Sequence, residues 1–466
     1  MTITPTIKVL LLNIGLVMML AGCAATQQQP DAAFSELASQ LWQAEQQLNK
    51  AEPGRLTDMS PEALATRNKQ RLGWQKKLQQ VDVARLSEQN QINHAILSYR
   101  LADDIDEYRY GAHLMPLTSE SGFHTSLGFL PQRTTFRSLN DYQLYIQQLS
   151  AIPRYMQQQT AWMQQGLASG MTQPKAVLKG FEQSIISYIT EPEQSVFFQP
   201  FKTKPAYISA EQWQLLQNDA AKQIRTAVNP AYQAFYDFMV QQYIPAARDT
   251  IAAGALPQGQ EYYQNRLQHY TTLNMTPAQV HQIGLDEVAR IHNEMRAIME
   301  KTGFDGDLKA FFNFMQTDPQ FYYPDTAEGK AAYLAEATRI IDTMKSRLDE
   351  LFIVKPKADM VVKAVEPFRE QSAGKAFYEQ PSMDGKRPGV YYANLYSMAD
   401  MPTYQLEALA FHEGIPGHHM QIAIAQELEG IPSFRKYGGY TAFSEGWGLY
   451  SELAPKEMGY YADPYS

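Results

Sequence analysis

Apolar residues recur at helical spacing through most of the first 350 residues, and this pattern limits the possible fold more than any other feature. Ile92, Ile96 and Tyr99, for example, fall on one face of a helix. Thr276 followed by Pro277 is a helix start signal, an N-cap hydroxyl before a proline at the first helical position. The patterns predict long helices over roughly residues 35–50, 61–79, 85–110, 139–169, 209–252, 276–302 and 329–352.

The pattern changes near residue 355, where short runs of β-branched and aromatic residues replace the helical periodicity. These runs are 359–365, 376–378 and 389–395, and a turn-rich stretch separates the last two. A new helix is predicted to start near Pro402. We therefore expect a mainly α-helical protein, a large multi-helix fold with a small antiparallel β-sheet next to an active-site helix.

Charge and cysteine content exclude several classes of protein. Forty Lys and Arg residues stand against 49 Asp and Glu residues, a formal net charge of −9, and this acidic balance argues against nucleic acid as a partner. The sequence contains one cysteine, which excludes both a disulfide framework and a cysteine-ligated metal cluster.

The N-terminal residues resemble a bacterial lipoprotein signal. Lys8 precedes an apolar run over residues 9–20 that is too short to span a bilayer comfortably. Leu20-Ala21-Gly22-Cys23 resembles a lipobox, which implies cleavage before Cys23 and a lipid anchor on its thiol. Ala24 resembles the sorting pattern of outer-membrane lipoproteins that face the periplasm, whereas the alternative is a membrane-anchor helix with an incidental cysteine. The predicted parts are a signal peptide over 1–22, a lipidated cysteine and tether over 23–33, and a folded domain over 34–466.

Three of the nine histidines, His412, His418 and His419, fall within eight residues and lie beside the carboxylate of Glu413. The familiar zinc-peptidase spacing places two histidines four residues apart on a helix, with a glutamate as base next to the first. That spacing is absent here, because Pro416 stands four residues after His412. Proline breaks a helix, so we expect a widened turn that returns a second histidine, either His418 or His419, to a metal shared with His412.

A catalytic zinc ion needs a third protein ligand and an open position. Glu445 is the candidate for that ligand, and Glu452, seven residues later, falls on the same helix face. Two aligned acids suit one ligand and one acceptor that orients a ligand imidazole. Gly446 and Gly448 would permit another helix to approach closely. The alternative for Glu445 is an ordinary acidic residue at a helix N-terminus, after Ser444.

Several segments together resemble one known family. They are His412–His419, Ser444–Glu452, Arg387–Leu395, Tyr262–Tyr263 and Tyr270–Thr272. They are similar to the bacterial DUF885 family, whose members are often lipoproteins and are grouped with the zinc metallopeptidase clan. The resemblance implies one zinc ion and a fold like that of carboxypeptidase Taq and the oligopeptidases. It implies a helical part over about 34–354, with the small sheet and active-site helices over about 355–466.

The resemblance has two further implications, one for the choice of the metal ligands and one for the C-terminal end of the chain. It favours His418 over His419, because Gly417-His418 resembles the Gly-His that ends the shorter zinc motif. In relatives the third ligand is a glutamate some two dozen residues after the second histidine, and Glu445 follows His418 by 27 residues. The family normally continues with further helices, whereas this sequence ends at Ser466, which leads us to expect a C-terminally truncated and less active form.

The predicted activity is the hydrolysis of small peptides by a membrane-anchored, zinc-dependent peptidase. Its metal ligands would be His412, His418 and Glu445, and Glu413 would be the general base. Weaker candidates for contact with the peptide are Tyr391, Tyr392, Asn394 and Tyr440, with the strand edge near 392–394 holding the peptide backbone.

Two other functions fit the same residues. The chain would be a non-catalytic envelope lipoprotein, or binding scaffold, if the histidine cluster were a surface turn or a vestigial metal site. It would be a metal-dependent amidase with a non-peptide substrate if the same metal chemistry acted on a different amide. The residues alone do not separate these alternatives from a peptidase.

Overall fold

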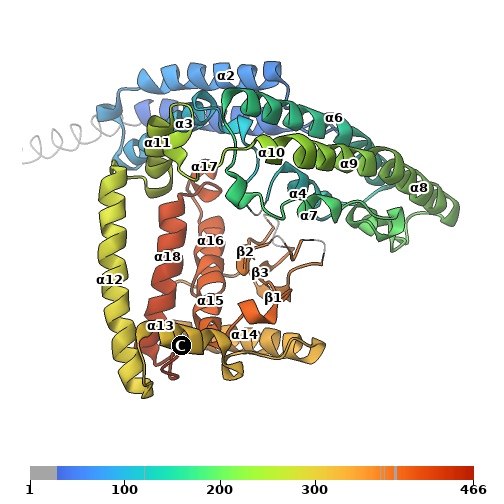
Figure 1. Cartoon of the computed structure of the whole chain (residues 1–466). Helices are drawn as coiled ribbons and strands as arrows, with labels where there is room; N and C mark the ends of the chain where they lie inside the picture. The colour runs from blue at the N-terminus through green and yellow to red at the C-terminus, as the bar shows by residue number, and fades with distance from the viewer. Residues whose placement is uncertain (1–28, 120, 368, 372, 383–385) are drawn as a thin grey trace, which may run out of the picture. The chain divides into compact units, whose positions relative to one another are not determined.

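The computed structural model describes residues 29–466 except 120, 368, 372 and 383–385 (Figure 1). Its residues divide into two units, one up to His113 and the other from Leu114 onward, whereas the sequence analysis placed one folded domain over 34–466. Helices make up most of the described chain and strands form one small sheet. The predicted fold class, mainly α with a small sheet, is therefore confirmed.

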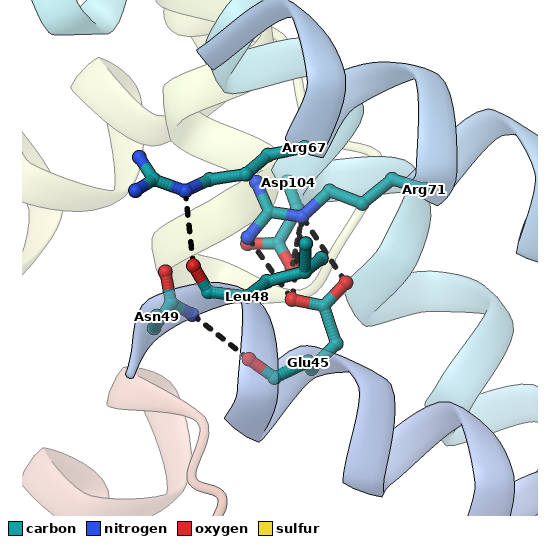
Figure 2. Close-up of polar contacts among 6 residues, drawn as sticks. All are labelled: Glu45, Leu48, Asn49, Arg67, Arg71 and Asp104. Atoms are coloured by element: carbon teal, nitrogen blue, oxygen red, sulfur yellow. Dashed lines mark hydrogen bonds and ion pairs between the residues drawn. The ribbon is translucent and has the colours of Figure 1, made fainter. Parts of the chain in front are cut away.

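The described part of the first unit contains three long helices. They are residues 29–49, α2 (Pro61–Gln79) and α3 (Glu88–Arg109). Figure 2 shows the polar contacts that join them: Arg71 of α2 pairs with Glu45 at 3.1 Å and lies 3.9 Å from Asp104 of α3. Arg67 donates to the carbonyl oxygen of Leu48 at 3.2 Å, which satisfies a free acceptor at the end of the first helix. Arg67 and Arg71 of α2 thus hold the two neighbouring helices of this unit in position along α2.

The second unit contains the remaining helices. They are α4 (Phe123–Leu127), α5 (Leu130–Arg133), α6 (Leu139–Ser169), α7 (Gln183–Ile186), α8 (Ala210–Gln223), α9 (Asn229–Phe238), α10 (Ile244–Ala246), α11 (Gly259–Thr271), α12 (Pro277–Thr302), α13 (Leu308–Thr317), α14 (Ala327–Arg347), α15 (Leu406–Glu413), α16 (His418–Glu427), α17 (Ser433–Lys436) and α18 (Thr441–Leu453). α12 begins at its predicted start signal: the Thr276 hydroxyl accepts from the backbone N–H of Gln279 at 3.3 Å.

The helix predicted over 209–252 is a rod of α8, α9 and α10 that ends at Ala246. Two π turns, Ile224–Val228 and Met239–Tyr243, join its three α-helices. Each π turn ends two residues before a proline, Pro230 or Pro245. A proline ring collides with the carbonyl group four residues earlier in a regular helix, and the wider turn gives that group room.

The sheet contains β1 (Met360–Ala364), β2 (Ala376–Glu379) and β3 (Gly389–Ala393) in the order β1-β3-β2. β2 is antiparallel to β3, but β1 is parallel to it, so the predicted antiparallel sheet is corrected to a mixed one. Successive strands do alternate in direction along the chain. Because β3 inserts between the other two, β1 pairs with a strand of its own direction.

β3 is buried on both faces, as its alternating side chains show. Tyr391 and Ala393 pack into an apolar cluster with α14 and α15, while Val390 and Tyr392 pack on the other face with Val365. Both edges of β3 are paired, one with β1 and one with β2. The expectation that a strand edge near 392–394 holds a peptide is therefore wrong, because the free edges of this sheet belong to β1 and β2.

Candidate metal centre

The chain breaks its helix between the two histidines that the sequence analysis paired. α15 ends at Glu413, a tight turn with a cis Ile415–Pro416 peptide follows, and α16 begins at His418. A side chain at Gly417 would collide with the carbonyl oxygen of His412, so the turn folds back against the last turn of α15. The imidazole rings of His412 and His418 consequently lie 4.6 Å apart between centroids, at 86° to each other.

α18 lies beside α15 and α16 and provides the acidic side of the site (Figure 1). At Gly448 a Cβ atom would come within 2.5 Å of His412 Cε1 and 2.8 Å of His412 Nε2. The His412 ring therefore rests against the bare backbone of α18. Glu445 lies one turn earlier on α18, in its second turn rather than at its N-terminus, so it is not a simple helix-dipole residue.

Three side chains from three helices converge. Glu445 Oε2 lies 3.5 Å from His412 Nε2, and Glu445 Oε1 lies 3.7 Å from His418 Nε2. One ligand atom from each residue lies within 4.8 Å of the others. Two ligand atoms of a tetrahedral zinc ion are about 3.3–3.5 Å apart. The donor set of two imidazoles and one carboxylate therefore fits a zinc ion, and the two distances from Glu445 to the imidazole nitrogens are close to this spacing.

Glu452 orients one of the imidazoles. Its Oε1 atom accepts a hydrogen bond from His412 Nδ1 at 2.7 Å, because a carboxylate can only accept. The proton on Nδ1 leaves Nε2 with its lone pair, which is the atom that faces Glu445. The hydrogen bond to Glu452 raises the pKa of His412, whereas burial lowers the pKa of His418.

Glu413 is the last residue of α15 and is only 7% exposed. Burial raises its pKa to about 7, and the nearby charges of Glu445 and Glu452 act in the same direction, while His412 lowers it. A carboxyl group with a pKa near neutrality can both accept and donate a proton at physiological pH. Glu413 thus has the protonation behaviour that a general base and acid requires.

The raised pKa of Glu413 predicts a pH-dependent stability of the metal-free protein. The folded state holds the Glu413 proton to about pH 7 and the unfolded state to about 4.5, so this group destabilises the fold as the pH rises through that range. Glu413→Gln removes the charge. We expect it to stabilise the metal-free protein by roughly 2 kcal/mol more at pH 8 than at pH 5, measured by denaturant unfolding. An effect independent of pH would contradict the raised pKa.

His419, the sequence's alternative ligand, lies outside this group. It is 1% exposed, and both of its ring nitrogens have partners: Tyr378 Oη at 2.8 Å and the carbonyl oxygen of Ala358 at 3.0 Å. Its ring therefore faces the sheet, and the geometry brings His418 rather than His419 to His412 and Glu445.

The four residues proposed for peptide contact have other surroundings. Tyr391 and Tyr392 are buried on the central strand β3, and Tyr392 donates to Glu366 at 3.2 Å. Asn394 donates to the carbonyl oxygens of Glu370 and Ala373, at 2.7 and 3.0 Å, and so holds the segment between β1 and β2. Tyr440 is the N-cap residue of α18.

Trp447 lies on α18 beside the site, although the sequence analysis did not single it out as a site residue. Its indole N–H donates to the carbonyl oxygen of Pro416 at 2.8 Å, and so joins α18 to the turn between the two histidines. Its position two residues after Glu445 was visible in the sequence. Its partner lies 31 residues away, and no local pattern indicated that pairing.

The predicted signal peptide and the lipid-bearing Cys23 lie outside the described residues. Among the helices of residues 29–466 that the structure describes, none combines the length and the apolar character needed to cross a membrane.

Comparison with known proteins identifies the family. A solved structure described as "the putative lipoprotein from Colwellia psychrerythraea" has the same fold, with a TM-score of 0.82 and 23% sequence identity over 94% of this chain and 80% of that chain. At this identity the likeness shows the fold alone. No curated protein matches the chain. The model of the family described as "Bacterial protein of unknown function (DUF885)" matches residues 42–466, so the chain belongs to the DUF885 family.

Proposed function

We propose that this protein is a zinc-dependent peptidase of the bacterial cell envelope. The observation that carries the proposal is the convergence of His412, His418 and Glu445 beside the buried carboxyl group of Glu413. Two imidazoles and a carboxylate are a common ligand set of catalytic zinc, and one position then stays open for water or substrate. A structural zinc site would instead be closed by a fourth protein ligand.

A zinc ion bound there would supply a positive charge that polarises a peptide carbonyl group and lowers the pKa of water. Glu413 would take a proton from the attacking water and pass it to the leaving nitrogen. Glu452 keeps His412 in the tautomer with a free Nε2. Substrate approaches from the side of Glu445, whose side chain is 55% exposed, against 16% for His412.

The lipid anchor is the part of the proposal that concerns location. Leu20-Ala21-Gly22-Cys23 resembles a lipobox, and a solved structure with this fold is described as a "putative lipoprotein". An acylated Cys23 would hold the enzyme on the membrane, and Ala24 favours the periplasmic face of the outer membrane.

One preparation tests the proposal: the full chain, extracted from bacterial membranes after expression. We expect an acylated N-terminal Cys23 by mass spectrometry, one zinc ion per chain by elemental analysis, and hydrolysis of members of a peptide library. Removal of the metal with a chelator should abolish hydrolysis, and added zinc should restore it. A chain without zinc would exclude the enzyme, and an unmodified N-terminus would exclude the anchor. Zinc without peptide hydrolysis would favour the non-catalytic scaffold or the amidase.

A further inference from the structure

His419 is a buried, fully hydrogen-bonded residue that the proposed chemistry does not use. It follows His418 directly in the first turn of α16. The carbonyl oxygen of Ala358 can only accept, so His419 Nε2 carries a proton and donates to it at 3.0 Å. In the neutral ring Nδ1 is then an acceptor, and the hydroxyl of Tyr378 donates to it at 2.8 Å. These two bonds fix the tautomer and the orientation of the ring.

One end of the sheet forms the binding site for this ring. Ala358 lies just before β1, Tyr378 belongs to β2, and Gly389 is the first residue of β3. A Cβ atom at Gly389 would lie 2.7 Å from His419 Nδ1 and would also collide with the Tyr378 hydroxyl. Strands β2 and β3 and the segment just before β1 therefore together enclose the imidazole ring of His419.

The other end of α16 contacts the same segment. Glu427, the last residue of α16, accepts from the backbone N–H groups of Lys357 and Ala358 at 2.7 and 2.9 Å. His419 and Glu427 thus hold α16 along residues 357–358 at two points, eight residues apart. The turn before α16 is not helical, so α16 is not a continuation of α15 and its start depends on contacts outside a continuous helix.

We propose that His419 and Tyr378 are positioning residues that hold the start of α16 on the sheet and so place His418 for zinc. This inference rests on the zinc site of the proposed function. The two adjacent histidines have different roles. The ring of His418 faces Glu445 at the proposed zinc site, and the ring of His419 faces the sheet. Loss of the bond from Tyr378 leaves His419 Nδ1 as a buried acceptor without a donor and frees the first turn of α16.

The test compares two tyrosine variants of the full chain. Tyr378→Phe removes the bond to His419. Tyr145→Phe is the control, because the buried hydroxyl of Tyr145 also donates one hydrogen bond, to the carbonyl oxygen of Phe197 at 2.9 Å, and has no part in the site. Zinc affinity is measured by competition with a chelator, and folding by circular dichroism and thermal unfolding. We expect zinc affinity to fall about 10-fold in Tyr378→Phe and to stay at the wild-type value in the control.

A second pair of variants tests His419 itself. His419→Gln keeps an amide donor that can reach Ala358, whereas His419→Leu removes all polar atoms. We expect zinc affinity to decrease in the order wild type, His419→Gln, His419→Leu. A merely structural effect would follow thermal stability instead of this chemical order.

The outcomes separate this inference from the proposed function. Equal zinc affinity in Tyr378→Phe and wild type, or equal losses in both tyrosine variants, would overturn the positioning role alone. Zinc binding without any hydrolysis by wild type would overturn the enzymatic function and leave the positioning role standing. A wild-type chain that binds no zinc would overturn both.

Discussion

Replacement of Glu413 by Gln is expected to lower kcat for peptide hydrolysis by about 10²- to 10⁴-fold, with zinc still bound at one ion per chain. Gln has nearly the same shape as Glu, so it fits the buried position at the end of α15, but it cannot take a proton from water. The ligand atoms of His412, His418 and Glu445 keep their places. Steady-state kinetics and metal analysis on the same preparation measure the two quantities.

Glu407→Gln is the matched control for this variant. Glu407 lies on the same helix, α15, six residues before Glu413, and outside the group of ligands. The same chemical change there should leave kcat and zinc content at the wild-type values. Hydrolysis retained in Glu413→Gln would remove Glu413 as the base, and zinc lost from it would make Glu413 part of the metal site itself.

The helices were the part of the fold that the sequence predicted best, because their signals are local. The predicted ranges 61–79 and 139–169 coincide with α2 and α6. Each has an N-cap serine, Ser60 or Ser138, whose hydroxyl accepts from a backbone N–H three residues later. Such signals depend on a few neighbouring residues and are independent of the rest of the fold.

The sheet shows where local signals are insufficient. The three strands were predicted near their observed positions, but the parallel pairing of β1 with β3 was not. The amino-acid composition of a strand does not indicate whether that strand lies at the centre or at the edge of the sheet. β3 is central because its two faces are both apolar, with Tyr391 on one and Tyr392 on the other, and this was visible only as a run of strand-forming residues.

The candidate site, like the fold, was predicted from the sequence only in part. The spacing of titratable residues led to His412, Glu445 and Glu452 and left His418 and His419 as alternatives, between which the family resemblance favoured His418. The residues that hold them were missed or undecided. Trp447 and Tyr378 act through partners 31 and 41 residues away, so only the folded chain reveals them.

Gly448→Ala is expected to weaken zinc binding at least 10-fold and to lower hydrolysis with it. The added methyl group would lie 2.5–2.9 Å from three atoms of the His412 ring, closer than any relaxed contact allows. The ring must move away from α18, and its Nε2 atom then leaves the distance of 3.5 Å to Glu445. Chelator competition measures the loss of affinity.

Gly446→Ala separates this steric effect from the general effect of alanine in a helix. Gly446 lies on the same helix, and a Cβ atom there meets nothing within 4 Å. Both substitutions gain up to about 1 kcal/mol of helix propensity, so Gly446→Ala should be slightly more stable than wild type, with unchanged zinc affinity. Wild-type affinity in Gly448→Ala would mean that His412 does not rest on the backbone of α18. The arrangement of His412, His418 and Glu445 around one ion would then lose its main steric constraint.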